Sequence, residues 1–229
     1  MLIHPHDAAT DDEWRAALFA KDFGQLISAA DEGGLPIVVP THFVFDGHDT
    51  IELHLASPNP VWARLEATPR AMLTIVDAYV YIPSSWNAVP PRTAETGVPT
   101  SYYVSVQATC DVEIVDDPDA IAAILRRQLG HFQPGGGHAP VDAEPDGAYT
   151  KLLGAIRGIK LTVTEVRAKL KYGGNRTAEQ RTAIAASLAD RSGPFDAEAR
   201  DHLLRRLRRT TLRESSCRPD AQLLIGRIA

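Results

Sequence analysis

Two histidines, His42 and His54, lie in neighbouring segments that are rich in β-branched residues, which is typical of strands. In such a position a neutral imidazole can ligate the iron of a haem or donate a hydrogen bond to a carbonyl of a flat ring system. A half-buried histidine that only completes the packing is the alternative. If iron is bound, His54 is the expected metal ligand, because Ala56, Ser57 and Pro58 follow it and place it near the end of its strand.

Aromatic rings are a second source of chemistry, because they can stack on a planar ligand while a hydroxyl or indole N–H finds a polar partner. Strand alternation places Tyr79 and Tyr81 on one face. Trp86 follows in a polar loop that prolines bound, where a ligand or a subunit is expected to cover its indole. We expect the other aromatic side chains in the core or in a subunit interface: Trp62, Tyr102 and Tyr103.

A cationic segment late in the chain could hold an anion, because fixed cations and free backbone donors bind phosphate or carboxylate groups. Its residues are Lys169, Lys171, Gly173-Gly174, Asn175 and Arg176. The two glycines would let the backbone approach the anion. Alternatively they form a turn before a helix, and the lysines are solvated on an edge strand.

A cluster of arginines, Arg205, Arg206, Arg208 and Arg209, could meet DNA phosphates, although such a run is usually a solvated helix face. The net charge of −5 provides no general attraction to nucleic acid. The sequence contains no nucleophile elbow, P-loop or dinucleotide fingerprint, so hydrolase and nucleotide-binding folds are not indicated.

Patterns of β-branched and aromatic residues predict the elements that must position these side chains. Strands are expected over Phe23–Ser28, Ile37–Phe45, Ile51–Leu55, Ala71–Ile82, Ser101–Val115 and Ile156–Val166. Apolar spacing of three and four predicts helices over 11–21 and 59–66 and from residues 118, 177 and 195. Close antiparallel connections of this kind favour a small barrel.

The remaining properties are those of a water-soluble protein, with 229 residues, 44% of them hydrophobic, and no long apolar segment. Cys110 and Cys217 stand apart without metal-ligand spacing, which fits a reducing cytoplasm. We expect residues 1–176 to form one cofactor-binding domain and 177–229 a helical appendage and tail. The segment 213–229 has no clear periodicity and suggests no role.

Several segments in order resemble the PaiB-like family of FMN-binding proteins, often described as negative transcriptional regulators. The resemblance covers about residues 1–180, and its most specific part is His54-Leu55-Ala56-Ser57-Pro58-Asn59-Pro60-Val61-Trp62. The other matching segments are Phe23–Ser28, Pro40-Thr41-His42, Ala78–Trp86, Val98–Tyr103 and Lys169–Arg176. The last two depart from the family pattern at Ser101-Tyr102 and Tyr172-Gly173-Gly174.

The resemblance implies an α+β fold, mainly an antiparallel split β-barrel related to pyridoxamine phosphate oxidase, with peripheral helices and a C-terminal helical appendage. It also implies a homodimer with cofactor sites at the interface. The implied cofactor-binding residues are His42, His54, Trp86, Tyr102, Lys169, Lys171, Asn175 and Arg176.

Three functions follow as hypotheses. The first is an FMN-binding, redox-linked regulator or small flavoenzyme. The second is an enzyme that uses haem b, like the family member piperazate synthase, which forms an N–N bond on a hydroxylated ornithine. The third is a repressor without a cofactor that binds DNA through its arginine helix.

Overall fold

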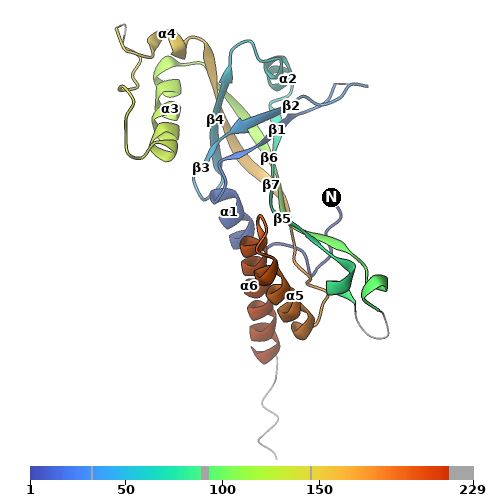
Figure 1. Ribbon diagram of the computed structural model, residues 1–229. Helices are drawn as coiled ribbons and strands as arrows, with labels where there is room; N and C mark the ends of the chain where they lie inside the picture. The colour runs from blue at the N-terminus through green and yellow to red at the C-terminus, as the bar shows by residue number, and fades with distance from the viewer. Residues whose placement is uncertain (32, 89–92, 145, 217–229) are drawn as a thin grey trace, which may run out of the picture. The chain divides into compact units, whose positions relative to one another are not determined.

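A computed structural model describes residues 1–31, 33–88, 93–144 and 146–216 of the chain (Figure 1). The α-helices are α1 (Asp11–Phe19), α2 (Val61–Ala67), α3 (Pro118–Phe132), α4 (Thr150–Leu153), α5 (Ala178–Arg191) and α6 (Asp196–Ser216). The strands are β1 (Phe23–Ser28), β2 (Val38–His42), β3 (Val44–Phe45), β4 (Thr50–Ala56), β5 (Arg70–Ile82), β6 (Thr100–Val115) and β7 (Ile156–Lys171). Two short 3-10 helices, η1 (Ser84–Asn87) and η2 (Ala94–Thr96), lie between β5 and β6.

The predicted elements are confirmed, with two differences. The segment predicted as one strand over Ile37–Phe45 is divided at Phe43, whose side chain is fully buried and whose N–H donates to Asp22 O at 2.9 Å. The late strand continues past Val166 to Lys171. The prediction therefore ended this strand too early.

The strands form one sheet in the order β2-β1-β5-β6-β7-β4-β3. Pairing is antiparallel, with Leu26 opposite both Val39 and Leu73, and Leu53 opposite Ile159. Since β2 and β3 stand at opposite ends of this order yet follow each other in the chain, the sheet bends round toward itself without closing. The fold is α+β with a split β-barrel, as expected.

The described chain divides into two compact units. The first holds Met1, Ala9–Val76 and Ser105–Lys169, and the second holds Leu2–Ala8, Asp77–Val104 and the chain from Leu170 onward. Strands β5, β6 and β7 contribute residues to both. The predicted division at residues 176 and 177 stays a prediction.

The first unit has an apolar core inside its strands, including the fully buried Leu26, Phe43, Leu53, Leu73 and Leu161. Helix α1 begins with a capping box in which Thr10 and Glu13 satisfy each other's backbone N–H groups. Its Trp14 lies 6.1 Å from Phe45 between ring centroids. Helix α1 therefore covers one side of this core.

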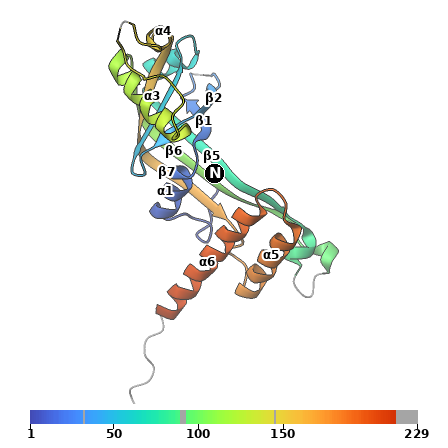
Figure 2. The ribbon, with the colours of Figure 1, turned by 60° about the vertical axis from the view of Figure 1, so that its left-hand side comes forward.

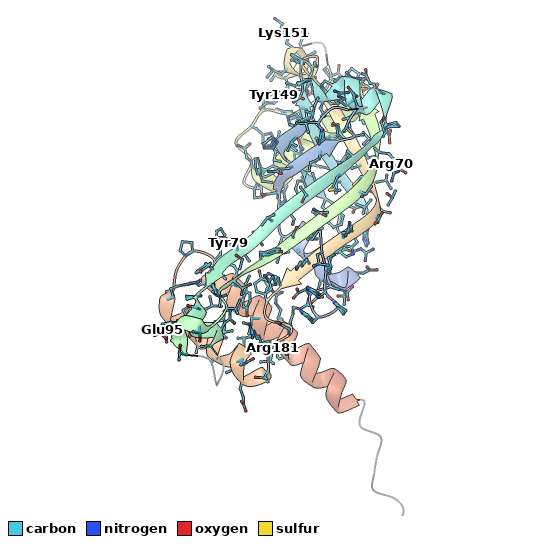
Figure 3. The ribbon with its side chains drawn as sticks, turned by 90° about the vertical axis from the view of Figure 1, so that its right-hand side faces the viewer. Arg70, Tyr79, Glu95, Tyr149, Lys151 and Arg181 are labelled. Atoms are coloured by element: carbon cyan, nitrogen blue, oxygen red, sulfur yellow. The ribbon has the colours of Figure 1, made fainter. Side chains whose placement is uncertain are left out.

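Strand β5 changes its buried face part-way along. Ala71, Leu73 and Ile75 are buried before the change, and Val80 and Ile82 after it. Ala78 lies between them with φ 45°, a left-handed conformation that non-glycine residues rarely adopt. Tyr79 (Figure 3) and Tyr81 are 53% and 51% exposed, so the prediction that they share one face is confirmed.

The second unit is built on the helix pair α5 and α6, which Figure 2 shows side by side. Thr177 and Gln180 form a capping box at the start of α5. Arg191 at the end of α5 donates to both carboxylate oxygens of Asp196, whose side chain is 2% exposed. This ion pair ties the end of α5 to the start of α6.

Within the described part of the chain, no helix is long and apolar enough to cross a membrane. Cys217 and most of the tail, residues 217–229, lie outside the described residues. Cys110 is fully buried, and burial raises the pKa of its thiol to about 12.

Candidate cofactor site

The two histidines singled out in the sequence lie together in the first unit. His42 ends β2 and His54 lies in β4, and their ring centroids are 5.2 Å apart with the rings at 72°. Strands β2 and β4 are far apart in the strand order but close in space, because the sheet bends toward itself. The pair therefore lies where the two ends of the split barrel approach each other.

His54 is oriented by a helix that the sequence analysis did not connect to it. Its Nδ1 lies 2.6 Å from Oε1 of Gln128 in α3, the helix that packs on β4 (Figure 1). An amide oxygen accepts, so the tautomer that fits this contact carries its proton on Nδ1 and leaves a lone pair on Nε2.

Gln128 occupies an apolar position of α3. It follows Ile121 by seven residues and Ile124 by four, and all three side chains are buried. Only 3% of Gln128 is exposed, and its Nε2 has no hydrogen-bond partner. A polar side chain on the core face of a helix requires a partner, and that sequence signal could have identified Gln128.

His42 is held in its neutral form. Burial lowers its pKa below the usual value, the neighbouring His54 lowers it further, and Asp22 opposes these effects. Because the pKa falls from an ordinary value of 6.5, the imidazole of His42 is uncharged at neutral pH. A neutral imidazole is the form that binds metals.

The edge of this cluster is partly apolar and open. Phe132 in α3 is 41% exposed, and its ring lies 5.3 Å from that of His42 at 82°. His131, beside it, is 3.1 Å from a carboxylate oxygen of Asp22. An exposed aromatic side chain beside two imidazoles can contact one edge of a planar ligand.

In the described residues, no group of three or more His, Cys, Asp or Glu side chains could hold a metal ion.

The predicted cationic segment is arranged around the end of β7. Lys171 donates from Nζ to Thr100 Oγ1 at 2.8 Å and lies 6.0 Å from the ring centre of Tyr103. Lys169 is buried, Asn175 is exposed and Arg176 is half-buried. Lys171 and Arg176 are thus the two cations of this segment that lie in the second unit and are partly open to solvent.

The two glycines beside them are required by packing. A Cβ on Gly173, which has φ 66°, would overlap Tyr102 Oη, and a Cβ on Gly174 would overlap the carbonyl oxygen of His6. The contacts that exclude a side chain at both positions come from the second unit itself. These glycines therefore do not by themselves indicate an anion site.

Tyr102 is 2% exposed, and its hydroxyl has no hydrogen-bond partner. Burial raises the pKa of its phenol to about 12, although Arg176 and Arg181 oppose the shift. Its ring meets Tyr172 edge to face at 5.7 Å, and Tyr172 stacks on His202 at 4.9 Å. Within its unit Tyr102 is a core residue, and its role toward a cofactor stays a prediction.

Trp86 has a partner in the second unit. The guanidinium of Arg191 lies 4.8 Å above its ring and also donates to Tyr81 O at 2.8 Å. This cation–π contact covers one face of the indole, where the sequence suggested a ligand or a subunit. In the predicted arginine cluster, Arg206 donates to the backbone oxygens of His6 and Ala8.

Neither His42 nor His54 lines either of two cavities in the first unit. One of about 290 Å³ is lined by Trp14, Arg15 and His48 among others. The other, of about 370 Å³, is lined by Arg157, Asp116 and Ile121 among others. Arg157 is already bound by Asp116 and Glu66.

The predicted site residues therefore form two groups. His42, His54 and Lys169 belong to the first unit, where the histidines are in contact. Trp86, Tyr102, Lys171, Asn175 and Arg176 belong to the second unit. The assignment of either group to a cofactor stays a prediction.

The fold and the histidine pair define a split-barrel protein with an open imidazole cluster between its barrel ends. Residues 1–165 match the family model described as "Putative FMN-binding domain". The chain belongs to this family. A search of curated protein sequences finds no significant match.

Solved structures share the fold at low sequence identity. The FAD and heme binding protein from Mycobacterium smegmatis is 18% identical with a TM-score of 0.57, over 78% of this chain and 80% of that one. The flavocytochrome Anf3 from Azotobacter vinelandii is 21% identical with a TM-score of 0.52, over 72% and 70%. A protein from Bacteroides thetaiotaomicron described as a "putative 5-nitroimidazole antibiotic resistance protein" is 15% identical with a TM-score of 0.53, over 71% and 85%.

Proposed function

We propose that this protein binds a flavin, FMN in the first instance, and acts as a PaiB-like redox-linked regulator or a small flavoenzyme. Membership of the FMN-binding domain family, over residues 1–165, is the observation that carries the proposal. The family resemblance of the histidine segments agrees with it, as do two structural relatives, one an FAD and heme binding protein and the other a flavocytochrome.

Lys171 and Arg176 are the residues of this chain that would hold the phosphate of FMN, because both are cationic and partly exposed. A bound flavin would supply one- or two-electron redox chemistry.

Purification without added cofactor, followed by titration with FMN, tests this proposal. We expect bound flavin absorbance and quenched flavin fluorescence. Lys171→Met and Arg176→Met should each weaken FMN affinity, whereas Lys151→Met, an exposed lysine of the first unit (Figure 3), should not. Absence of FMN binding at micromolar protein would refute the proposal.

A second candidate is a haem-dependent enzyme of the piperazate synthase kind, forming an N–N bond on a hydroxylated ornithine. The favouring observation is the 2.6 Å contact of His54 Nδ1 with Gln128 Oε1, which would leave Nε2 for a metal ion. A histidine that binds a metal through one ring nitrogen usually donates from the other to a carbonyl or carboxylate, so His54 would be the residue that holds the haem iron. Bound haem b would supply the redox-active iron.

An absorption spectrum separates the two candidates. The haem candidate predicts a Soret band that His54→Ala removes and His131→Ala leaves in place, since His131 pairs with Asp22 instead. A flavin spectrum with no Soret band, before and after incubation with hemin, would exclude the second candidate.

We further propose that the protein is a homodimer that binds a small molecule. Tyr79 and Tyr81 are more than half exposed on one face of β5, and such exposed aromatic side chains are common at subunit interfaces. Sedimentation should give twice the chain mass, and Tyr79→Glu with Tyr81→Glu should give the monomer. Any direct DNA binding should weaken steeply with salt, and no mobility shift at low salt would exclude it.

A further inference from the structure

The contact between His54 and Gln128 bears on a property of the site that the family match does not specify, namely which nitrogen of His54 carries the proton. Nδ1 lies 2.6 Å from Gln128 Oε1, which is hydrogen-bond distance. An amide oxygen has no proton to give, so the tautomer that matches this contact carries its proton on Nδ1 and has a bare Nε2.

The surroundings hold Gln128 in place. It lies on the buried face of α3 with Ile121 and Ile124, and only 3% of it is exposed. Its Nε2 has no partner, which is an unfavourable arrangement for a buried amide. A side chain kept in this position at a cost in stability is consistent with a role at the neighbouring histidine.

We infer that Gln128 is a positioning residue that holds His54 as the Nδ1–H tautomer and so presents Nε2 as a bare electron-pair donor. Such a nitrogen binds a Lewis acid, for example the iron of a haem, or accepts from an N–H group. It cannot donate to a ring carbonyl, which was one of the two roles that the sequence allowed for a histidine here. The part of this inference that concerns iron rests on the haem candidate above.

The other side chain described next to His54 is His42, which meets the His54 ring edge to face with centroids 5.2 Å apart. His131 pairs with Asp22. Gln128 is thus the residue to change.

The experiment uses the full-length protein with ¹⁵N-labelled histidine and no added cofactor. Two-bond ¹⁵N–¹H correlation spectra report the tautomer of each imidazole. We expect the Nδ1–H pattern for His54 in the wild type, retained in Gln128→Glu, which keeps an acceptor. Gln128→Met has a similar length but no acceptor of comparable strength, and should lose this pattern. His131→Gln, on the same helix, should leave it unchanged.

Titration with hemin then gives the second readout. We expect Gln128→Met to weaken hemin binding roughly 10- to 100-fold, the usual effect of removing a group that orients a metal-binding histidine. Gln128→Glu should restore affinity and shift the Soret spectrum, because a carboxylate makes the imidazole more electron-rich. Backbone amide spectra of each variant establish that it is folded.

The outcomes are distinguishable. A wild-type His54 that carries its proton on Nε2, or a folded Gln128→Met variant with an unchanged tautomer, overturns the inference. If the wild type shows the Nδ1–H pattern but does not bind hemin, the role of Gln128 in setting the tautomer is supported and the haem candidate is excluded.

Discussion

Replacing Gly173 with alanine tests whether this glycine serves packing in the second unit. Its φ of 66° is left-handed, which costs an alanine about 1–2 kcal/mol. The new methyl group would also overlap Tyr102 Oη, and overpacking of this kind costs about 1–3 kcal/mol. We therefore expect Gly173→Ala to lower the free energy of unfolding by about 2–5 kcal/mol, measured by urea denaturation without cofactor.

Two further variants separate these contributions. Gly136 has φ 74° and open space around its Cα, so Gly136→Ala should show the conformational cost alone. Adding Tyr102→Phe to Gly173→Ala removes the overlapping oxygen and leaves the ring carbon at 3.3 Å, which should recover about 1–2 kcal/mol. If Gly173→Ala costs no more than Gly136→Ala, or if Tyr102→Phe recovers nothing, the packing explanation is wrong.

Three other predictions follow from buried groups. Asp196→Ala should lower the unfolding free energy by about 2–4 kcal/mol in urea denaturation, because it leaves the partly buried Arg191 without its carboxylate; a loss below about 1 kcal/mol would contradict this. The pKa of Tyr102 rises from 10.0 to about 12 on folding, so stability from this group is full below pH 10 and is lost as pH rises toward 12. Tyr102→Phe should make that alkaline decline shallower in denaturation curves at successive pH values, and an identical pH dependence would count against the burial of its hydroxyl. In a Cys217→Ser background, Cys110 should react with a thiol reagent only after unfolding, because its thiol is buried with a pKa of about 12; rapid labelling of the native protein would show otherwise.

Local patterns in the sequence predicted most of the fold. The alternation around Tyr79, the β-branched runs and the apolar spacing of the helices are patterns between near neighbours, so the sequence displays them directly. Residues far apart in the chain were harder. The pairing of His42 with His54 depends on how the sheet bends, and the family resemblance suggested only that both belong to one site.

Contacts between particular side chains of different helices and strands could not be predicted from the sequence. Gln128 bonds to His54 across 74 positions, and no local pattern relates the two. Arg191 covers Trp86 from a helix that was predicted only as an appendage. Gly173 fits both a ligand-binding turn and a packing requirement, and only the position of Tyr102 distinguishes them.

Ala78, with its left-handed backbone, divides β5 into two parts. Odd-numbered side chains are buried before it, and even-numbered side chains are buried after it. Deleting a single residue here would restore a regular alternation. Because the deletion removes the extra residue, Tyr79 and Tyr81 would still face solvent, while Val80 and Ile82 would still be buried. A relative that is one residue shorter here should therefore be aligned with a gap at this point, since an alignment without the gap would compare opposite faces of the strand.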